Sequence, residues 1–236
     1  MSIDSIHGAR EHHIQFEKPE PRMMMRNHMS HYFEQAAIEW DNDPNRVQMA
    51  RTIADTMIRI LQPAGTETVM DYGTGTGLIA LHIRQYVKRI VAVDSAQNML
   101  AVLGQKLAEG GITSVEQRAW NIGMETGDLP QFDIIVSSMT LHHVRNTDSA
   151  ARVFYSLLKP GGRIAIADLN AENGEFHEKP GIAEHDGFDR DVLRQIFSDA
   201  GFRDIRFYEA ATITKRSSGT GQIRSFSIFL LTAARD

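Results

Sequence analysis

Asp71-Tyr-Gly73-Thr-Gly75-Thr-Gly77 is the stretch that decides the fold of this chain. It closes a short apolar run at residues 68–70 and opens a second one at 78–81. This order is typical of a strand, a glycine loop and a helix. Glycine lets the backbone turn tightly and approach a ligand, and the helix that follows presents unpaired N–H groups to an anion. We therefore expect a ligand-binding loop at the end of a buried strand.

A second apolar run, residues 89–94, ends in Asp94 about twenty residues after the glycine loop. An acid at the tip of the second strand of such a unit accepts hydrogen bonds from both hydroxyls of a ribose. Ser95 can cap the next helix. The alternative role for Asp94 is to cap that helix beside Ser95, and its position favours the ribose. The sequence thus predicts a cofactor that contains adenosine.

The glycine spacing differs from the dinucleotide fingerprint G-x-G-x-x-G, because the third glycine arrives one residue early. The pattern D-x-G-x-G-x-G at a strand end resembles motif I of the class I S-adenosylmethionine-dependent methyltransferases. Leu158-Lys-Pro-Gly-Gly162 resembles that family's turn into its fifth strand, and residues 132–144 resemble its fourth strand and the following loop. The resemblance spans roughly residues 30 to 236. It implies S-adenosylmethionine as cofactor and S-adenosylhomocysteine as product.

Composition excludes several other classes. The 236 residues suffice for one well-cored α/β domain, and a net charge of −5 gives no sign of the basic face that binds nucleic acid. The absence of cysteine excludes a disulfide framework and a zinc-thiolate site. Neither an apolar leader nor a membrane-spanning run is visible. We expect a cytoplasmic protein without a membrane span.

Strands and helices alternate after the glycine loop, which predicts a parallel sheet with helices on both faces. The expected strands cover residues 67–72, 89–94, 114–120, 132–138 and 163–169. Two β-rich runs follow at 203–214 and 224–233, and the resemblance implies that they pair as a hairpin. The expected fold is a Rossmann-like, mostly parallel, seven-stranded sheet with an N-terminal helical lid. Residues 1–62 would form the tail and lid, and residues 63–236 the cofactor-binding domain.

The resemblance assigns cofactor contacts residue by residue. The glycines would lie under the methionine part of the cofactor. Asp71 would orient the amino-acid end, although it can also cap the N–H groups of its own loop. Asn121 stands where the family often has Asp, facing the adenine amine, and Ile122 would offer a backbone N–H to the ring. Met99 would pack on the adenine or ribose, or else in the core. The full set is Asp71, Gly73, Thr74, Gly75, Gly77, Asp94, Ser95, Met99, Asn121, Ile122, Ser138, Tyr32 and Trp40.

The loop after the fourth strand bears on the acceptor. Relatives that methylate amide or ring nitrogens begin an Asn-Pro-Pro-Tyr-like motif at the position of Ser138, and this chain has Ser138-Met-Thr-Leu141 instead. This difference argues against methylation of nucleobase or glutamine amino groups. His142 and His143 follow directly, and a neutral imidazole suits proton removal near pH 7. They are the catalytic candidates, and the alternative for both is a structural role.

The N-terminal aromatic residues predict a lid. The pattern around Tyr32, Phe33 and Trp40 is similar to small-molecule methyltransferases whose N-terminal segment folds over the cofactor. An aromatic wall would favour the sulfonium through cation–π contact, and plain helix packing is the alternative. His177 and His185 lie in a polar connection at 170–188, where their irregular spacing favours a solvated loop over a metal site. Nothing in the sequence requires a metal.

These observations favour methyl transfer from S-adenosylmethionine to a small-molecule acceptor, at oxygen or carbon. The Pro-Gly-Gly turn and the lid are similar to quinone-biosynthesis methyltransferases. One alternative is a module that binds S-adenosylmethionine without transferring its methyl group. Another is a nicotinamide-dependent oxidoreductase, since fold alone does not decide function. No nucleic-acid partner is expected, and the oligomeric state is left as monomer or homodimer.

Overall fold

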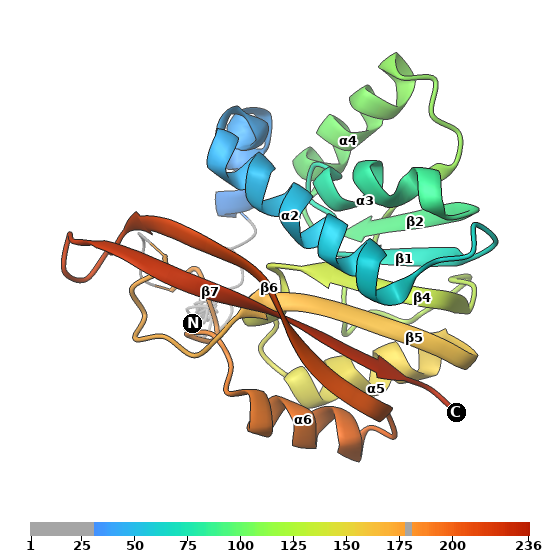
Figure 1. The fold of residues 1–236 in the computed structure, drawn as a ribbon. Coiled ribbons are helices and arrows are strands. Elements are labelled where there is room, and N and C mark those ends of the chain that lie inside the picture. The colour runs from blue at the N-terminus through green and yellow to red at the C-terminus, as the bar shows by residue number, and fades with distance from the viewer. Residues whose placement is uncertain (1–30, 178–180) are drawn as a thin grey trace, which may run out of the picture.

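The computed structural model describes residues 31–177 and 181–236, and seven strands form one sheet in the order β3-β2-β1-β4-β5-β7-β6 (Figure 1). Residues 1–30, which belong to the expected tail and lid, lie outside the described part. The strands are β1 (Thr68–Tyr72), β2 (Arg89–Asp94), β3 (Val115–Ala119), β4 (Phe132–Ser138), β5 (Leu158–Leu169), β6 (Arg203–Arg216) and β7 (Ile223–Ala234).

Strands β1 to β5 are mutually parallel, and β7 is antiparallel to both β5 and β6. Parallel neighbours end at the same edge, so the carboxyl ends of β1, β2, β4 and β5 lie together. The order of the strands reverses between β1 and β4, which is where ligands bind in open α/β sheets. The predicted Rossmann-like, mostly parallel, seven-stranded fold is confirmed.

Helices cover both faces of the sheet (Figure 1). One layer contains α2 (Pro44–Leu61), α3 (Leu78–Ile83) and α4 (Gln97–Glu109), and the other contains α5 (Thr147–Leu157) and α6 (Arg190–Asp199). Each face has its own apolar core, because alternate strand residues point to opposite sides: Val69 joins the first core and Met70 the second. Three 3₁₀ segments complete the described elements: η1 (Ala37–Asn42), η2 (Arg84–Tyr86) and η3 (Leu141–His143).

Most element boundaries agree with the sequence analysis. Helix α2 starts at Asp43-Pro44, a pair typical of a helix start, with Asp43 accepting hydrogen bonds from the N–H groups of Asn45 and Arg46. Strand β5 begins at Leu158, earlier than predicted, because the Pro-Gly-Gly turn belongs to the strand. Helix 31–36 continues into η1 through the position of Trp40.

The predicted helix cap at Ser95 is wrong. Ser95 is exposed, the N-cap of α4 is Ala96, and no side chain at that position caps the helix. The Glu34 carboxylate takes the role instead, accepting hydrogen bonds from the N–H groups of Gln97 (2.8 Å) and Asn98 (2.6 Å). A helix N-terminus favours such an acid, and here it comes from the N-terminal segment.

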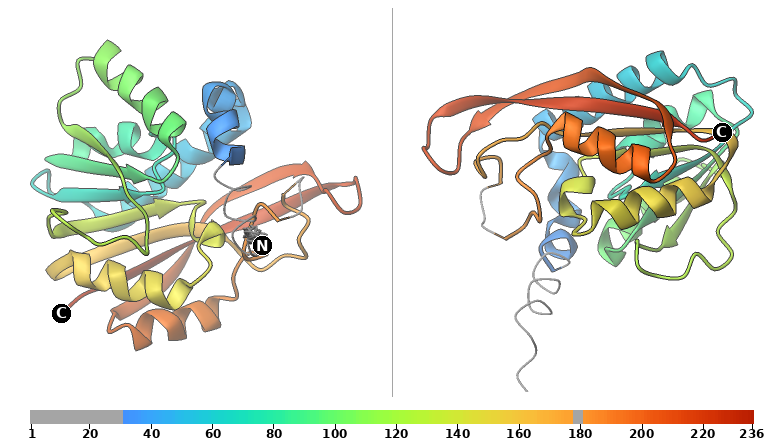
Figure 2. Two further views of the ribbon diagram at one scale, coloured as in Figure 1. Left: turned by 180° about the vertical axis from the view of Figure 1, so that it is seen from behind. Right: turned by 90° about the horizontal axis from the view of Figure 1, so that it is seen from below.

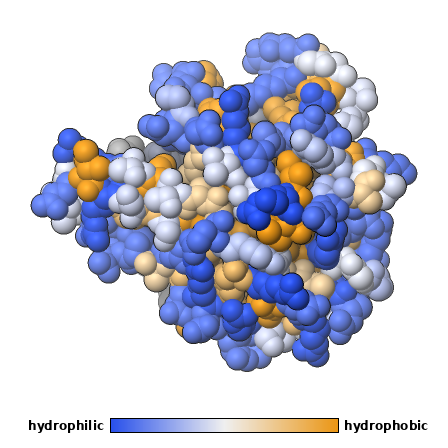
Figure 3. Space-filling model, viewed as in Figure 1, coloured by the Kyte–Doolittle hydropathy of each residue, from blue (hydrophilic) through white to orange (hydrophobic). Residues whose placement is uncertain are grey.

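The β6–β7 hairpin extends beyond the rest of the sheet (Figure 2). The 170–188 connection lies against its projecting end, where Glu175 accepts a hydrogen bond from the Ser217 hydroxyl and Lys215 donates to the Phe176 carbonyl. The face shown in Figure 3 is mostly hydrophilic, with apolar residues in small patches. No helix among the described residues has the length and apolar character to span a membrane.

Candidate active site

The glycine loop crosses over the end of β2. The N–H groups of Gly73 and Thr74 both donate to the Val93 carbonyl, at 2.9 and 3.0 Å. Gly73, Gly75 and Gly77 all have φ in the left-handed region, at 70°, 56° and 84°. Residues with a side chain seldom adopt this conformation, so the loop depends on glycine for its shape.

The three glycines differ in what surrounds them. A Cβ atom on Gly73 would lie 2.2 Å from the Thr140 side chain, and one on Gly77 would lie 2.4 Å from Leu103. A Cβ on Gly75 would meet only the Met99 sulfur, at 3.9 Å. Gly73 and Gly77 are therefore needed for packing, whereas Gly75 faces open space on the side where a ligand would lie.

We expect Gly75→Ala to fold and to bind S-adenosylmethionine at least about tenfold more weakly. The strain at φ 56° is about 1–2 kcal/mol, and the added methyl group occupies the ligand's side of the loop. Gly77→Ala is the matched control, since its clash with Leu103 destabilises the fold instead. Thermal unfolding and calorimetric titration of both variants measure the two effects. Wild-type affinity in Gly75→Ala would contradict the assignment.

Asp94 joins the glycine loop to helix α4. Its Oδ2 accepts a hydrogen bond from the Gly75 N–H at 2.8 Å, and its Oδ1 accepts from the Ala96 N–H at 2.9 Å. Burial raises the pKa of the Asp94 carboxyl. Each carboxylate oxygen has a second lone pair. Asp94 can therefore accept hydrogen bonds from the loop and helix N–H groups and, as expected, from the hydroxyls of a ribose.

Asp71 is almost fully buried at the end of β1 and accepts a hydrogen bond from the Thr74 hydroxyl at 2.7 Å. Burial, opposed by this hydroxyl and reinforced by the charge of Asp94, raises the pKa of Asp71 to about 7. Asp71 thus holds the glycine loop through Thr74, close to the structural role that was one of its two expected roles. Its carboxyl is also half-protonated near neutral pH.

The raised pKa of Asp71 predicts a pH-dependent affinity. If Asp71 binds the ammonium group of the cofactor, only its ionised form does so, and that form becomes populated as the pH rises toward 7. We expect the affinity for S-adenosylmethionine to rise roughly tenfold from about pH 5.5 to 7, below the range near 7.7 where an α-amino group loses its own proton. Calorimetry at several pH values measures the slope.

Two controls isolate this effect. Asp71→Asn should bind more weakly and with no slope over the same range. Methylthioadenosine, which lacks the amino-acid part, should bind the wild type without the slope. A slope that persists in Asp71→Asn would assign the titration to another group.

The adenine side of the site is less enclosed. Asn121 is exposed directly after Trp120, whose backbone N–H donates to the Asp94 carbonyl at 3.0 Å. The backbone of Ile122 hydrogen-bonds to the hydroxyl of Tyr72, and burial raises the pKa of Tyr72 to about 12. Met99 is buried, in contact with Ala37 and Ala96. Met99 therefore has the core position that was its alternative, beneath the N-terminal segment.

The N-terminal segment is tied to the glycine loop and to α4. Asp41 accepts a hydrogen bond from the Thr76 hydroxyl at 2.6 Å and pairs with Lys106, whose ammonium also donates to the Thr76 carbonyl. Together with the Glu34 cap, these contacts hold residues 31–42 over the cofactor side of the sheet. They support the expected lid.

The aromatic residues of the expected lid contact different partners. Phe33 contacts Tyr32, Trp40 and His143 edge-to-face, with ring centroids 5.3, 5.7 and 5.1 Å apart. The Arg46 guanidinium stacks on the Trp40 ring, 3.9 Å from its centroid, and so covers one face of that ring. Phe33 is thus the aromatic ring that joins the lid to the histidines.

His142 is buried and paired with Asp168 at the end of β5. Its Nδ1 lies 2.6 Å from Asp168 Oδ1, and its backbone N–H donates to Asp168 Oδ2 at 3.2 Å. The His142 carbonyl accepts hydrogen bonds from the N–H groups of Glu184 and His185. A carboxylate that accepts from Nδ1–H leaves the lone pair on Nε2. In this arrangement the carboxylate orients the histidine, and the histidine can act as a base.

The loop that carries the histidines is fixed against the glycine loop. Thr140 donates hydrogen bonds to the carbonyls of Gly73 (3.3 Å) and Ser138 (3.0 Å). Met139 has a left-handed φ of 53°, which is rare for a residue with a side chain. Ser138 is half-buried at the end of β4. This turn places η3, with both histidines, next to the end of β1.

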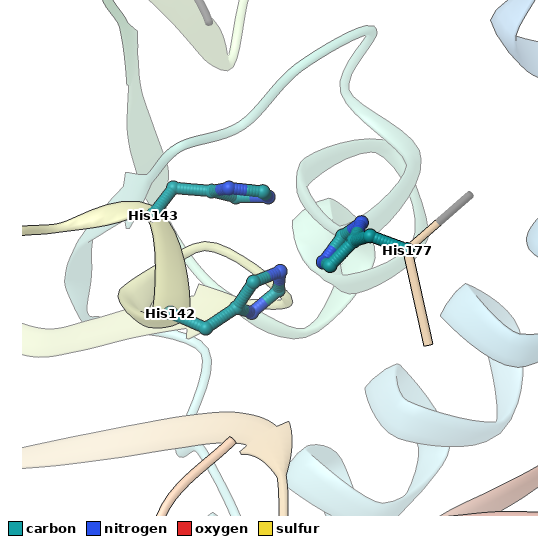
Figure 4. Close-up of side chains that lie close together, drawn as sticks. All are labelled: His142, His143 and His177. Carbon is teal, nitrogen blue, oxygen red and sulfur yellow. The ribbon is translucent and has the colours of Figure 1, made fainter. Parts of the chain in front are cut away.

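The solvated loop expected around His177 is wrong. His177 is half-buried and stacks with His142 and His143 at centroid distances of 5.0 and 5.3 Å (Figure 4). His185 does not join them: its Nε2 lies 3.0 Å from the Val144 carbonyl and its ring packs near Phe188. The spacing of residues along the sequence does not predict that His177 lies beside His142 and His143, because this contact depends on the tertiary fold.

Asp168 was also missed, although the sequence carried a signal for it. It is a carboxylate inside the apolar run 163–169, and a buried charge needs a partner. Glu34 and Asp41 gave no comparable signal, because their contacts are with distant segments. The structure brings Asp71, Asp94 and both catalytic candidates to one edge of the sheet, with Asn121 at its periphery.

Comparison with known proteins gives the family. The family described as a methyltransferase domain matches residues 46–206, more than half of the chain. The chain belongs to this family. The predicted family of S-adenosylmethionine-dependent methyltransferases, with that cofactor, is thereby confirmed.

Similar proteins agree with this membership. The chain is 32% identical over 148 residues to an uncharacterized methyltransferase of Schizosaccharomyces pombe, covering 56% of this chain and 52% of that protein. It is 28% identical over 172 residues to the ubiquinone/menaquinone biosynthesis C-methyltransferase UbiE of Escherichia coli, covering 60% of this chain and 68% of that protein. The chain thus spans about half the length of the first of these relatives.

A solved structure shares the fold. A SAM-dependent methyltransferase from Aquifex aeolicus superposes with a TM-score of 0.63 over 88% of this chain and 98% of that one, at 18% identity. At this identity the likeness concerns the fold alone.

Proposed function

We propose that this protein transfers the methyl group of S-adenosylmethionine to oxygen or carbon of a small-molecule acceptor. The observation that carries the proposal is the buried His142–Asp168 pair beside the glycine loop. Methyl transfer from a sulfonium needs mainly in-line positioning. A hydroxyl or an acidic carbon also has to lose a proton, and His142 and His143 are the groups placed to assist this.

The cofactor would lie along the carboxyl ends of β1 and β2. In this proposal Asp94 accepts from the ribose hydroxyls, Asp71 faces the ammonium group, and Gly75 lies under the chain of the cofactor. Thr74, Ser95, Asn121, Ile122 and Ser138 line the remaining sides. Met99 packs in the core beneath the N-terminal segment, and Tyr32 and Trp40 belong to the lid. Glu34 and Asp41 hold that lid in place.

The acceptor would enter between the lid and the 170–188 connection. His143 and His177 are half-buried there, and Phe33 covers one side of His143. The name of the relative UbiE refers to C-methylation in quinone biosynthesis, which makes phenolic and quinol-like compounds the first acceptors to screen. Such acceptors ionise at oxygen, consistent with a histidine nearby.

The test is a methyl-donor assay that follows formation of S-adenosylhomocysteine with a panel of phenols, enols and carboxylates. Turnover with one class supports transfer and identifies the attacked atom by mass spectrometry. Tight cofactor binding without turnover across the panel would favour a binding module. Quenching of nicotinamide fluorescence, with no binding of S-adenosylmethionine, would favour an oxidoreductase.

A further inference from the structure

Three histidines from two segments far apart in the sequence converge on one space beside the proposed acceptor site (Figure 4). Among residues 31–177 and 181–236, His142, His143 and His177 form the only group of three or more potential metal ligands with this proximity. One ligand atom from each ring lies within 4.8 Å of those of the other two. The His142 and His143 rings are 4.0 Å apart at their centroids.

Hydrogen bonds fix the tautomers of two of these rings. His142 Nδ1 lies 2.6 Å from the Asp168 carboxylate, and His143 Nδ1 lies 2.9 Å from the Ile182 carbonyl. Both partners are acceptors, so each Nδ1 carries its hydrogen and each Nε2 carries a lone pair. Metal-binding histidines are held in this way, with the second nitrogen donating to a carboxylate or a backbone carbonyl.

A carboxylate lies behind the three rings. Asp168 Oδ1 is 2.6 Å from His142 Nδ1, and the Asp168 side chain is fully buried. Its negative charge would partly offset the charge of a bound cation.

Two of the nitrogens are buried without a protein partner. His142 Nε2 and His177 Nε2 have no hydrogen-bond partner within the described part of the chain. His142 is only 1% exposed. A buried polar atom that lacks a hydrogen-bond partner is unfavourable, and here two such nitrogens lie side by side. A cation held between them removes this cost.

We propose that His142, His143 and His177 bind a divalent transition-metal ion, with Zn²⁺ the ion that fits the ligands best. Three neutral imidazoles without thiolate suit Zn²⁺, and also Co²⁺ and Ni²⁺, better than Mg²⁺ or Ca²⁺. Tetrahedral Zn²⁺ with bonds of about 2.0–2.1 Å places its nitrogens about 3.4 Å apart. The three ligand atoms, which now lie within 4.8 Å of one another, would therefore move together by roughly an ångström.

Metal binding at this site does not depend on the proposed function. A role of the ion in catalysis does rest on it. Three protein ligands leave one tetrahedral position open, as in catalytic zinc sites. An acceptor hydroxyl bound there would release its proton to solvent water more readily, because the ion stabilises the oxyanion. That oxygen would then form a bond to the methyl carbon as the carbon–sulfur bond breaks and S-adenosylhomocysteine leaves. The lone pair of His142 Nε2 then holds the ion and is not the direct proton acceptor. Asp168 is a positioning residue that orients His142.

Metal binding is measured on the full chain without an affinity tag of histidines, after removal of metal by dialysis against a chelator. Zn²⁺ is titrated in competition with a chromophoric chelator, and Co²⁺ is titrated while visible absorption is recorded. His142→Ala and His177→Gln remove ligands, and Asp168→Asn removes the partner behind His142. His82→Gln is the matched control, because His82 is a surface histidine paired with Asp55. The chain has ten histidines, so differences between variants define the site.

We expect one equivalent of Zn²⁺ to bind to the wild type and to His82→Gln. Asp168→Asn should weaken it by roughly 10- to 100-fold, the usual effect of losing a partner behind a ligand, and the two ligand variants by more. Bound Co²⁺ should give the strong visible absorption of a tetrahedral site. Equal binding by the wild type and His177→Gln, or no stoichiometric binding, would overturn the proposal.

The affinity of the same proteins for S-adenosylmethionine separates the two proposals. His177→Gln should bind the cofactor as the wild type does, which also shows that it is folded. Zn²⁺ binding without cofactor binding would refute the proposed function and leave the metal site standing. Methyl transfer that is unchanged by metal removal would refute the catalytic role of the ion.

Discussion

Replacing His142 by Ala is expected to lower kcat for methyl transfer by about 10²- to 10⁴-fold, the usual contribution of a group that promotes proton removal, whether it takes the proton itself or holds a metal ion that acidifies the acceptor. The affinity for S-adenosylmethionine should stay within about a factor of two, since the proposed cofactor contacts lie on β1, β2 and the glycine loop. Formation of S-adenosylhomocysteine with the best acceptor, and calorimetry with the cofactor, measure the two quantities.

Asp168 gives a second test of the same pair. Asp168→Asn keeps the shape of the side chain but cannot hold the Nδ1–H tautomer in the same way, so kcat should fall and its pH profile should shift. Asp168→Glu should recover part of the activity. His82→Ala, at a surface histidine that also pairs with an aspartate, should change neither quantity. A wild-type kcat in His142→Ala would remove this residue from the reaction.

Asp94→Ala is expected to weaken binding of S-adenosylmethionine and S-adenosylhomocysteine by at least about 100-fold. Hydrogen bonds to a charged group are worth about 1.5–3 kcal/mol each, and the proposed ribose contact has two of them. The variant also releases the N–H groups of Gly75 and Ala96, which loosens the loop. Both consequences lower the affinity.

Two variants separate these consequences. Asp94→Asn retains one acceptor oxygen and should lie between the wild type and Asp94→Ala. Asp191→Ala removes an exposed acid on α6 that pairs with Arg194, and it should bind like the wild type. Undiminished affinity in a folded Asp94→Ala protein would show that the ribose does not bind at this carboxylate.

Most of the fold could be predicted from the sequence because its signals are local. Strands β2 and β4 have the bounds that their apolar runs indicate, and α2 begins at the Asp43-Pro44 cap. The glycine loop was visible because positive φ angles require a specific residue type. The cap of α4 was predicted wrongly, since Glu34 comes from a segment 63 residues earlier.

The candidate site was only partly predictable for the same reason. Asp71, Asp94 and the two adjacent histidines stand at strand ends, so the alternating pattern brings them to one edge. The partners of His142 come from elsewhere: Asp168 ends β5, and His177 depends on the path of the 170–188 connection. Spacing along the chain carries no information about such contacts. Packing and burial in the folded protein show them.

The central claim is that the glycine loop and Asp94 bind S-adenosylmethionine, and calorimetric titration of the purified protein tests it most directly. We predict saturable binding of both S-adenosylmethionine and S-adenosylhomocysteine at one site per chain, with micromolar affinity typical of such cofactors, about −8 kcal/mol. A folded protein that binds neither ligand, and instead quenches nicotinamide fluorescence, would contradict it.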